Sequence, residues 1–400
     1  MTEKVDVLII GAGIIGLSIA KALLEDDSKL TVVLIEKESE LGYHASGRNS
    51  GVLHAGFYYS PDSLKARFCR DGNRALRELC HEANIPVRDV GKVVVTRNDD
   101  EEEHLNKLFE RGIQNGVKIE LLNKKELKNI EPLAVTKENF IWSPTTGVSD
   151  PESIIQALAS KVRDLGAKII FGQSAQWGEG VGNIDTQASH WSARHVVNAS
   201  GAQADRIAKR YGFAQNLTMI PFMGVYRCIP ESQLALRRLV YPVPNPLNPF
   251  LGVHFTISAH NLIKIGPTAI PLLNREQYSL LEKWNLDDIK ESIIGISAMF
   301  KGSFHDMPAL VQSEFPKLFA SRLVSASADL VPSAKNIRGW KKMRPGIRAQ
   351  LIDRNSGQLI NDFLVEGDKD STHVLNAVSP GWTAAIPFGS HIAERVIAQL

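Results

Sequence analysis

A run of closely spaced glycines is the strongest chemical signal in the sequence. The letters G-A-G-I-I-G at residues 11–16 follow a short β-branched strand, residues 5–10, and lead into an apolar helix. In such a turn the first glycine allows the tight bend, the second lets the backbone approach a pyrophosphate, and the third permits close helix–strand packing. The free N–H groups at the start of the helix would bind the phosphates. The candidate cofactor contacts here are Gly11, Gly13, Ile14, Ile15 and Gly16.

A carboxylate lies at the position where a dinucleotide-binding turn requires one. A second apolar strand, residues 30–35, ends at Glu36, which lies 20 residues after Gly16. At that distance a carboxylate accepts hydrogen bonds from the adenosine ribose of a dinucleotide. A negative charge there also disfavours a ribose that carries a 2′-phosphate. Glu36 and its neighbour Lys37 are therefore candidate cofactor contacts, and the unit predicts dinucleotide binding.

The residues that follow look like a loop around an extended ligand. Residues 42–56 are too rich in glycine, serine and asparagine to form regular structure. Backbone amides in such a loop can contact a long cofactor. The glycine motif itself leaves FAD and NAD both open. The candidate contacts in the loop are Ser46, Arg48, Asn49, Ser50 and Gly51.

Several blocks along the whole chain carry a family resemblance. They are residues 5–37, 47–59 (containing N-S-G-V-L-H-A-G-F-Y-Y), 63–66, 143–150, 196–201, 241–244, 250–256 (F-L-G-V-H-F-T), 265–267, 346–350 and 379–381. With these blocks the chain resembles the D-amino-acid-oxidase-like superfamily of FAD-dependent oxidoreductases. Within it, the chain looks most like the L-2-hydroxyglutarate dehydrogenase (oxidase) family.

The resemblance implies FAD as the cofactor and an α/β fold with a second, α+β domain. A Rossmann-type FAD-binding domain would be assembled from residues 1–85, 145–215 and 336–400. A discontinuous mixed-sheet substrate domain would use residues 86–144 and 216–335. The block around Ala199 and Gly201 would return the chain to the FAD. The implied reaction is oxidation of an L-2-hydroxy acid, in particular L-2-hydroxyglutarate to 2-oxoglutarate, by hydride transfer to flavin N5.

A 2-hydroxy acid needs a cation for its carboxylate. Arginine suits this role because its planar fork binds a carboxylate through two hydrogen bonds. Arg348 is the main candidate, and a structural or flavin-contacting role is its alternative. Lys341, Lys342 and Arg344 are further candidates. A second carboxylate would need more partners, for which the candidates are Arg48, Tyr58, Tyr59 and Tyr241.

The hydroxyl proton needs a base, and an imidazole titrates near neutral pH. His54 follows the glycine-rich loop, and His254 lies in an expected strand of the substrate domain. Either could be the base, and His54 could instead anchor the flavin covalently.

Near the C-terminus a strand, a turn and a helix start bring Gly381, Trp382 and Thr383 to the flavin, although Trp382 could be a core residue. There a helix N-terminus would stabilise negative charge on the reduced ring.

Composition sets limits on the partners. Lys plus Arg is 46 and Asp plus Glu is 44, so a net charge of +2 gives no reason to expect nucleic acid. Three cysteines without Cys-x-x-Cys spacing indicate a reducing, cytoplasmic compartment. Residues 239–263 and 371–393 lack Asp, Glu, Lys and Arg, but prolines make them pocket walls rather than membrane spans. Peripheral contact with the inner membrane stays open.

A long polar helix is expected near residues 275–299, and no metal site is expected. Oxygen, a quinone and a carrier protein are equally open as electron acceptors. Three other functions compete with the hydroxy-acid dehydrogenase: an amino-acid or amine oxidase of the same superfamily, a non-catalytic flavin-binding module, and a nicotinamide dehydrogenase.

Overall fold

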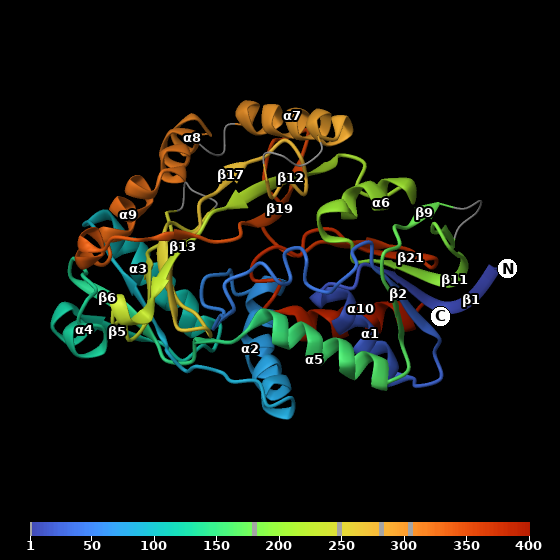
Figure 1. The fold of residues 1–400 in the computed structure, drawn as a ribbon, viewed down its shortest axis with the longest axis horizontal. Coiled ribbons are helices and arrows are strands. Elements are labelled where there is room, and N and C mark those ends of the chain that lie inside the picture. The colour runs from blue at the N-terminus through green and yellow to red at the C-terminus, as the bar shows by residue number, and fades with distance from the viewer. Residues whose placement is uncertain (1, 178–181, 246–249, 280–283, 303–306) are drawn as a thin grey trace.

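The computed structural model describes residues 2–177, 182–245, 250–279, 284–302 and 307–400. Its strands form two large sheets at opposite ends of the molecule, joined by a small three-stranded sheet (Figure 1). None of the helices within these ranges is long and apolar enough to cross a membrane.

The first large sheet is built around the glycine-rich turn. Its main path runs β20-β21-β11-β1-β2-β8, and every pair from β21 to β8 is parallel. Parallel neighbours fit the β-branched, fully apolar strands that the sequence shows. The strands are β1 (Thr2–Ile10), β2 (Val32–Ile35), β8 (Lys168–Ile170), β9 (Gln176–Trp177), β10 (Asn183–Asp185), β11 (His190–Asn198), β20 (Val365–Gly367) and β21 (Ser371–Val374).

Helices cover both faces of this sheet. Val7 and Ile9 pack into one core with α1, α5 and α10, while Leu8 and Ile10 pack with Ile207 of α6 on the other face. Figure 1 shows α6 on the opposite side of the sheet from α1 and α10. The Rossmann-type arrangement is thereby confirmed. The helices are α1 (Ile14–Asp26), α2 (Leu64–Glu82), α5 (Pro151–Asp164), α6 (Ala204–Arg210) and α10 (Ala385–Ile397).

The second large sheet is mixed, as the substrate domain was expected to be. Its order is β18-β13-β16-β15-β14-β4-β6-β5, and β14 and β4 are its parallel pair. The strands are β4 (Lys92–Val95), β5 (Glu120–Asn123), β6 (Asn139–Ser143), β13 (Arg227–Pro230), β14 (Leu239–Pro242), β15 (His254–Ile257), β16 (Leu262–Gly266) and β18 (Lys341–Lys342). Helices α3 (Asp100–Gln114), α4 (Lys124–Ile130), α8 (Met307–Glu314) and α9 (Ala320–Ala328) belong to this end of the molecule (Figure 1).

The small sheet joins the two ends. Strand β12 (Leu217–Gly224) pairs with β17 (Ile270–Pro271) and, over eight residues, with β19 (Gly346–Asp353). This pairing links chain segments that the sequence assigned to different domains, so the exact domain limits stay a prediction. A separate two-stranded sheet joins β3 (Val52–Leu53) to β7 (Gly147–Val148).

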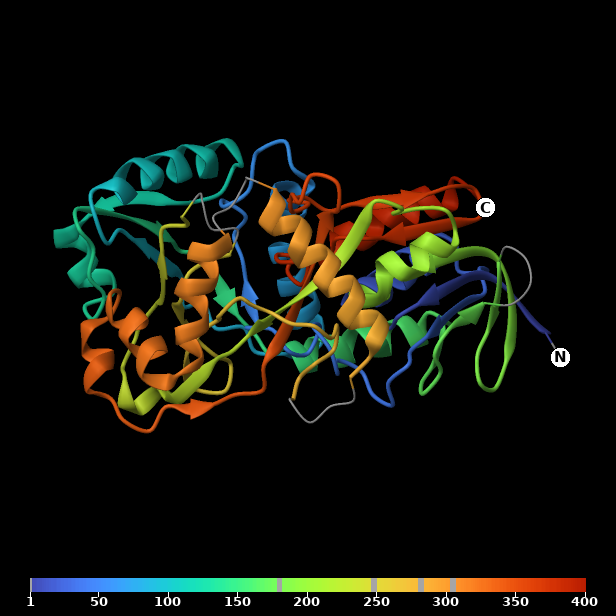
Figure 2. The same ribbon diagram turned by 90° about the horizontal axis from the view of Figure 1, so that it is seen from above.

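The expectation of a helix beginning near Arg275 was wrong. Helix α7 (Leu286–Lys301) begins eleven residues later, where Asn285 caps it by accepting from the backbone of Asp287 and Asp288. Arg275 instead lies in the preceding loop, fully buried, with ion pairs to Asp205 and Glu291. Figure 2 shows α7 lying across β12. The buried ion pairs hold Arg275 in this loop, outside the helix.

Candidate active site

An open cavity of about 580 Å³ lies where the sheets meet. Nearly all of the predicted cofactor residues line it, although they come from four separate parts of the chain. They are Gly11, Gly13, Ile14, Ile15, Glu36, Lys37, Ser46, Arg48, Asn49, Ser50, Ala199, Gly201, Gly381, Trp382 and Thr383, together with His54 and Arg348. Two predicted cofactor residues, Gly16 and Gly51, are not among the lining residues.

Different steric reasons require glycine at positions 13, 16 and 51. A Cβ at Gly16 would lie 2.0 Å from the carbonyl oxygen of Gly11, so Gly16 serves the close packing of helix on strand. A Cβ at Gly51 would lie 2.3 Å from the carbonyl oxygen of Ser149. At Gly13 a Cβ would meet only the Ser46 hydroxyl, at 3.1 Å. Gly13 therefore leaves room for a ligand, as a pyrophosphate site requires.

Glu36 is oriented by backbone amides. Its Oε2 accepts from the N–H of Ala12 at 3.0 Å, and its Oε1 accepts from the N–H of Glu38 at 3.0 Å. A carboxylate has about four acceptor positions, so further lone pairs remain for ribose hydroxyls. The first turn of α1 carries no acidic residue, which leaves its positive end available to phosphates. The residues present therefore fit a dinucleotide such as FAD.

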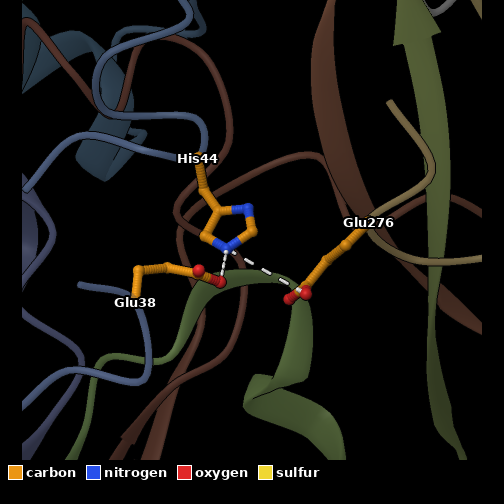
Figure 3. Close-up of side chains that lie close together, drawn as sticks. All are labelled: Glu38, His44 and Glu276. Carbon is orange, nitrogen blue, oxygen red and sulfur yellow. Dashed lines mark hydrogen bonds and ion pairs between the residues drawn. The ribbon is translucent and has the colours of Figure 1, made fainter. Parts of the chain in front are cut away.

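Figure 3 shows Glu38, His44 and Glu276 pointing toward one another; of these, His44 and Glu276 line the cavity. Within the described residues, these three have the spacing of a metal-binding group. The Lys37 ammonium, however, already contacts them: its Nζ lies 2.7 Å from Glu276 and 2.9 Å from His44. Burial works against the charge, but the two carboxylates outweigh it and raise the pKa of Lys37. A lysine cation thus balances the cluster and ties the segment after β2 to the loop before α7.

Arg348 is the main predicted carboxylate-binding residue, and it lines the cavity, as does Arg48, a candidate for the second carboxylate. Arg348 lies on β19 opposite Phe222, and its guanidinium is 5.5 Å from the centre of the Phe250 ring. Burial lowers its pKa, and the nearby hydroxyls of Tyr226 and Tyr59 oppose that effect. An arginine remains charged under such conditions. The three further candidates for this carboxylate, Lys341, Lys342 and Arg344, are exposed and do not line this cavity.

His54 is held in place through its backbone. Its N–H donates to the Thr383 hydroxyl at 3.3 Å, and its carbonyl accepts from the Asn73 amide at 3.1 Å. Burial, followed by the charges of Lys92, His254 and Arg348, holds the pKa of His54 well below its usual range. The imidazole is therefore neutral at neutral pH, which is the form that accepts a proton.

His254 has a defined tautomer. Its Nδ1 lies 2.9 Å from the carbonyl oxygen of Gly252, and since a carbonyl only accepts, Nδ1 carries the proton. In the neutral ring Nε2 then holds a lone pair. Burial lowers the pKa of His254 to about 3, with Lys92 and Arg348 adding to the effect. The ring stacks on Tyr241 with centroids 3.8 Å apart.

The substrate-side tyrosines do not form part of the wall of this cavity. Tyr58, Tyr59, Tyr241 and His254 do not line the large cavity in the way that His54 and Arg348 do. They are nevertheless coupled to it, because Arg348 affects the pKa of both Tyr59 and His254. The proposed substrate contacts therefore form a layer behind the open space.

Two lysines were missed by the sequence reasoning. Lys92 is fully buried at the start of β4, and Lys65 of α2 is buried close to Arg348 and Asp362. No motif marks either one. The single available signal was a charged residue directly before the apolar run Val93–Val95, which is unusual for a buried strand.

Comparison with known proteins identifies the family. The family described as "FAD dependent oxidoreductase" (DAO) matches residues 6–395. The chain belongs to this family. It is 34% identical over 398 residues to "L-2-hydroxyglutarate dehydrogenase" of Escherichia coli (strain K12), covering 98% of this chain and 93% of that protein. It is 31% identical over 417 residues to "L-2-hydroxyglutarate dehydrogenase, mitochondrial" of Homo sapiens, covering 99% and 89%.

Solved structures support the same fold. L-alpha-glycerophosphate oxidase from Mycoplasma pneumoniae with FAD bound matches with a TM-score of 0.74 and 23% identity, covering 100% of this chain and 95% of that one. Glycine oxidase from Geobacillus kaustophilus matches with a TM-score of 0.72 and 20% identity, covering 99% and 95%. The predicted superfamily, the FAD cofactor and the oxidoreductase class are confirmed.

Proposed function

We propose that this FAD enzyme oxidises L-2-hydroxyglutarate to 2-oxoglutarate. The observation that carries the proposal is the grouping of Arg348 with the neutral imidazole of His54 at one cavity, with the neutral imidazole of His254 in the layer behind it. The chain that carries them matches L-2-hydroxyglutarate dehydrogenases along its length. Bound FAD supplies the hydride acceptor, flavin N5. The remaining steps belong to the residues of this chain.

Arg348 would bind the carboxylate next to the reacting carbon through two parallel hydrogen bonds. That contact fixes the position of the C–H and O–H bonds relative to the imidazoles. The hydroxyl proton passes to a neutral imidazole. The hydride, with its electron pair, leaves the carbon that carries this hydroxyl for flavin N5, so the C–O bond becomes C=O. His254 offers its Nε2 lone pair for the proton, and His54 is the second candidate base.

We propose the cofactor contacts on the same grounds. Gly13 and the start of α1 would hold the pyrophosphate, and Glu36 would hold the ribose. The turn at Gly381–Thr383 would approach the flavin ring, because it lines the same cavity as His54 and Arg348. Tyr58, Tyr59 and Tyr241 are proposed as substrate contacts from the sheet side.

We also infer a cytoplasmic enzyme that touches the inner membrane peripherally. Three free cysteines support the reducing compartment. The outer side of α7 supports the membrane contact, because Leu286, Ile293 and Phe300 are each at least half exposed. Oxygen, a quinone or a carrier protein would take the electrons.

The test is anaerobic reduction of the purified yellow protein. L-2-Hydroxyglutarate should bleach the flavin absorbance, and the D-isomer should not. Bleaching by L-glutamate instead would favour the amino-acid oxidase, and no bleaching by any hydroxy or amino acid would favour a non-catalytic module. Addition of oxygen or a soluble quinone to the reduced protein then identifies the acceptor by the return of the absorbance.

A further inference from the structure

A lysine is buried in the substrate-side sheet without an acceptor for its Nζ in the described part of the chain, and this burial lowers its pKa to about 7. Lys92 is 0% exposed, and among the described residues none accepts a hydrogen bond from its Nζ. Its neighbours are aromatic: Nζ lies 4.5, 4.4 and 4.9 Å from the ring centres of Phe57, Tyr58 and Tyr241. Cation–π contacts compensate only part of the cost of burying an unpaired charge. A cation kept in such a place is therefore a candidate for binding an anion.

The register of the sheet places Lys92 on the same face as the base candidate. Lys92 lies opposite Leu239 of β14, and Val240 lies opposite Phe255 of β15. Since side chains alternate along a strand, Lys92, Tyr241 and His254 project to one face. The stacking of Tyr241 on His254 agrees with this register.

This face adjoins the active site, behind the large cavity, which Lys92 itself does not line. Lys92 and Arg348 each contribute to the lowered pKa of both His54 and His254. The two neutral imidazoles thus lie within the fields of two cations that come from different sheets, β4 and β19. A second cation would suit the second carboxylate of a dicarboxylate substrate.

A hydroxyl beside Lys92 also lacks a partner. The buried Tyr58 hydroxyl has no hydrogen-bond partner among the described residues, and its ring contacts the Lys92 ammonium. Burial raises the pKa of Tyr58 well above its usual range, so the hydroxyl keeps its proton and can donate. An ammonium and a neutral hydroxyl are together a donor pair for one carboxylate.

We propose that Lys92, with the Tyr58 hydroxyl, binds the carboxylate remote from the reacting carbon and so makes the enzyme selective for dicarboxylic 2-hydroxy acids. The inference rests on the proposed function and names the specificity determinant of that same site. Arg348 would hold one end of the substrate and Lys92 the other, with the imidazoles between them.

The experiment compares two substrates that differ by one carboxylate. Wild-type protein and K92M are reduced anaerobically with L-2-hydroxyglutarate and with L-2-hydroxypentanoate, which has the same carbon chain without the second carboxylate. In K92M, kcat/KM for the dicarboxylate should fall about 10- to 100-fold, the value of one charge-assisted hydrogen bond, and kcat/KM for the monocarboxylate should stay within about threefold. K264M, which changes a half-buried lysine on β16 of the same sheet, should change neither value.

An equal loss for both substrates, or no loss for either, would overturn the role of Lys92. Should K92M fail to retain FAD, K92Q takes its place. A second measurement does not depend on turnover: glutarate and pentanoate are titrated against the flavin absorbance of the holoenzyme. Tighter binding of glutarate by wild type, lost in the variant, supports the inference even if L-2-hydroxyglutarate fails to bleach the flavin, in which case only the proposed function falls. Equal binding of both acids by wild type overturns the inference.

Discussion

Replacing Arg348 by Met tests the central contact of the proposed mechanism. Arg348 is the cation on β19 that lines the cavity together with His54. The variant would lose two charge-assisted hydrogen bonds to the substrate carboxylate, worth roughly 3–5 kcal/mol together. This corresponds to a 10²- to 10⁴-fold fall in kcat/KM for L-2-hydroxyglutarate. R348K keeps the charge but not the fork, so its loss should be smaller.

The same substitution should also move the pH profile. Arg348 contributes to the lowered pKa of His54 and His254, so its removal raises both values, that of His254 from about 3. The base must be neutral, so kcat/KM is lost as the pH falls through its pKa. The acid limb of the R348M profile should therefore lie at higher pH than that of the wild type.

The assay is stopped-flow reduction of the flavin under anaerobic conditions between pH 3 and 9, a range that reaches the pKa of His254 at about 3. Variant R344M is the matched control, because Arg344 is an exposed arginine four residues away that does not line the cavity. Flavin content and melting temperature are recorded for each protein. A correctly loaded R348M with wild-type kcat/KM and an unmoved acid limb would refute the reasoning.

Three further predictions concern the base, the cofactor turn and the fold. If His254 is the base, H254Q should slow flavin reduction about 10²- to 10⁴-fold while H54Q, measured in the same assay, slows it less; the reverse order would assign the base to His54. G13V should yield a folded but colourless protein, because the added side chain meets only the Ser46 hydroxyl and the space for the pyrophosphate. G16A should instead lower the melting temperature, because its Cβ would clash with the carbonyl oxygen of Gly11. Equal loss of FAD and equal melting temperatures would contradict that distinction. R275M should lower the free energy of unfolding, measured in urea titrations, by about 3–5 kcal/mol. The substitution leaves the carboxylates of Asp205 and Glu291 without their buried partner. A loss below about 1 kcal/mol would show that the ion pairs contribute little.

Much of the cofactor end could be predicted from local sequence. The strand, the glycine turn and the helix at residues 2–26 are contiguous, and each glycine acts on neighbours within a few residues or on the adjacent strand. Glu36 follows at the end of the next strand, so its position relative to the turn depends on one short crossover. Arg348 and the two histidines could be named because they stand in distinctive blocks.

Only the tertiary structure decided how distant residues act together. Lys92 looks like part of an ordinary apolar strand until the register of β4 and β14 places it beside Tyr241, nearly 150 residues away. Arg275 looks like the start of a helix until the fold supplies Asp205 as its buried partner. Charge in a protein interior is governed by which groups surround it in space. The sequence by itself therefore determined the cofactor turn and the family, whereas the second cation at the substrate end depended on long-range strand pairing.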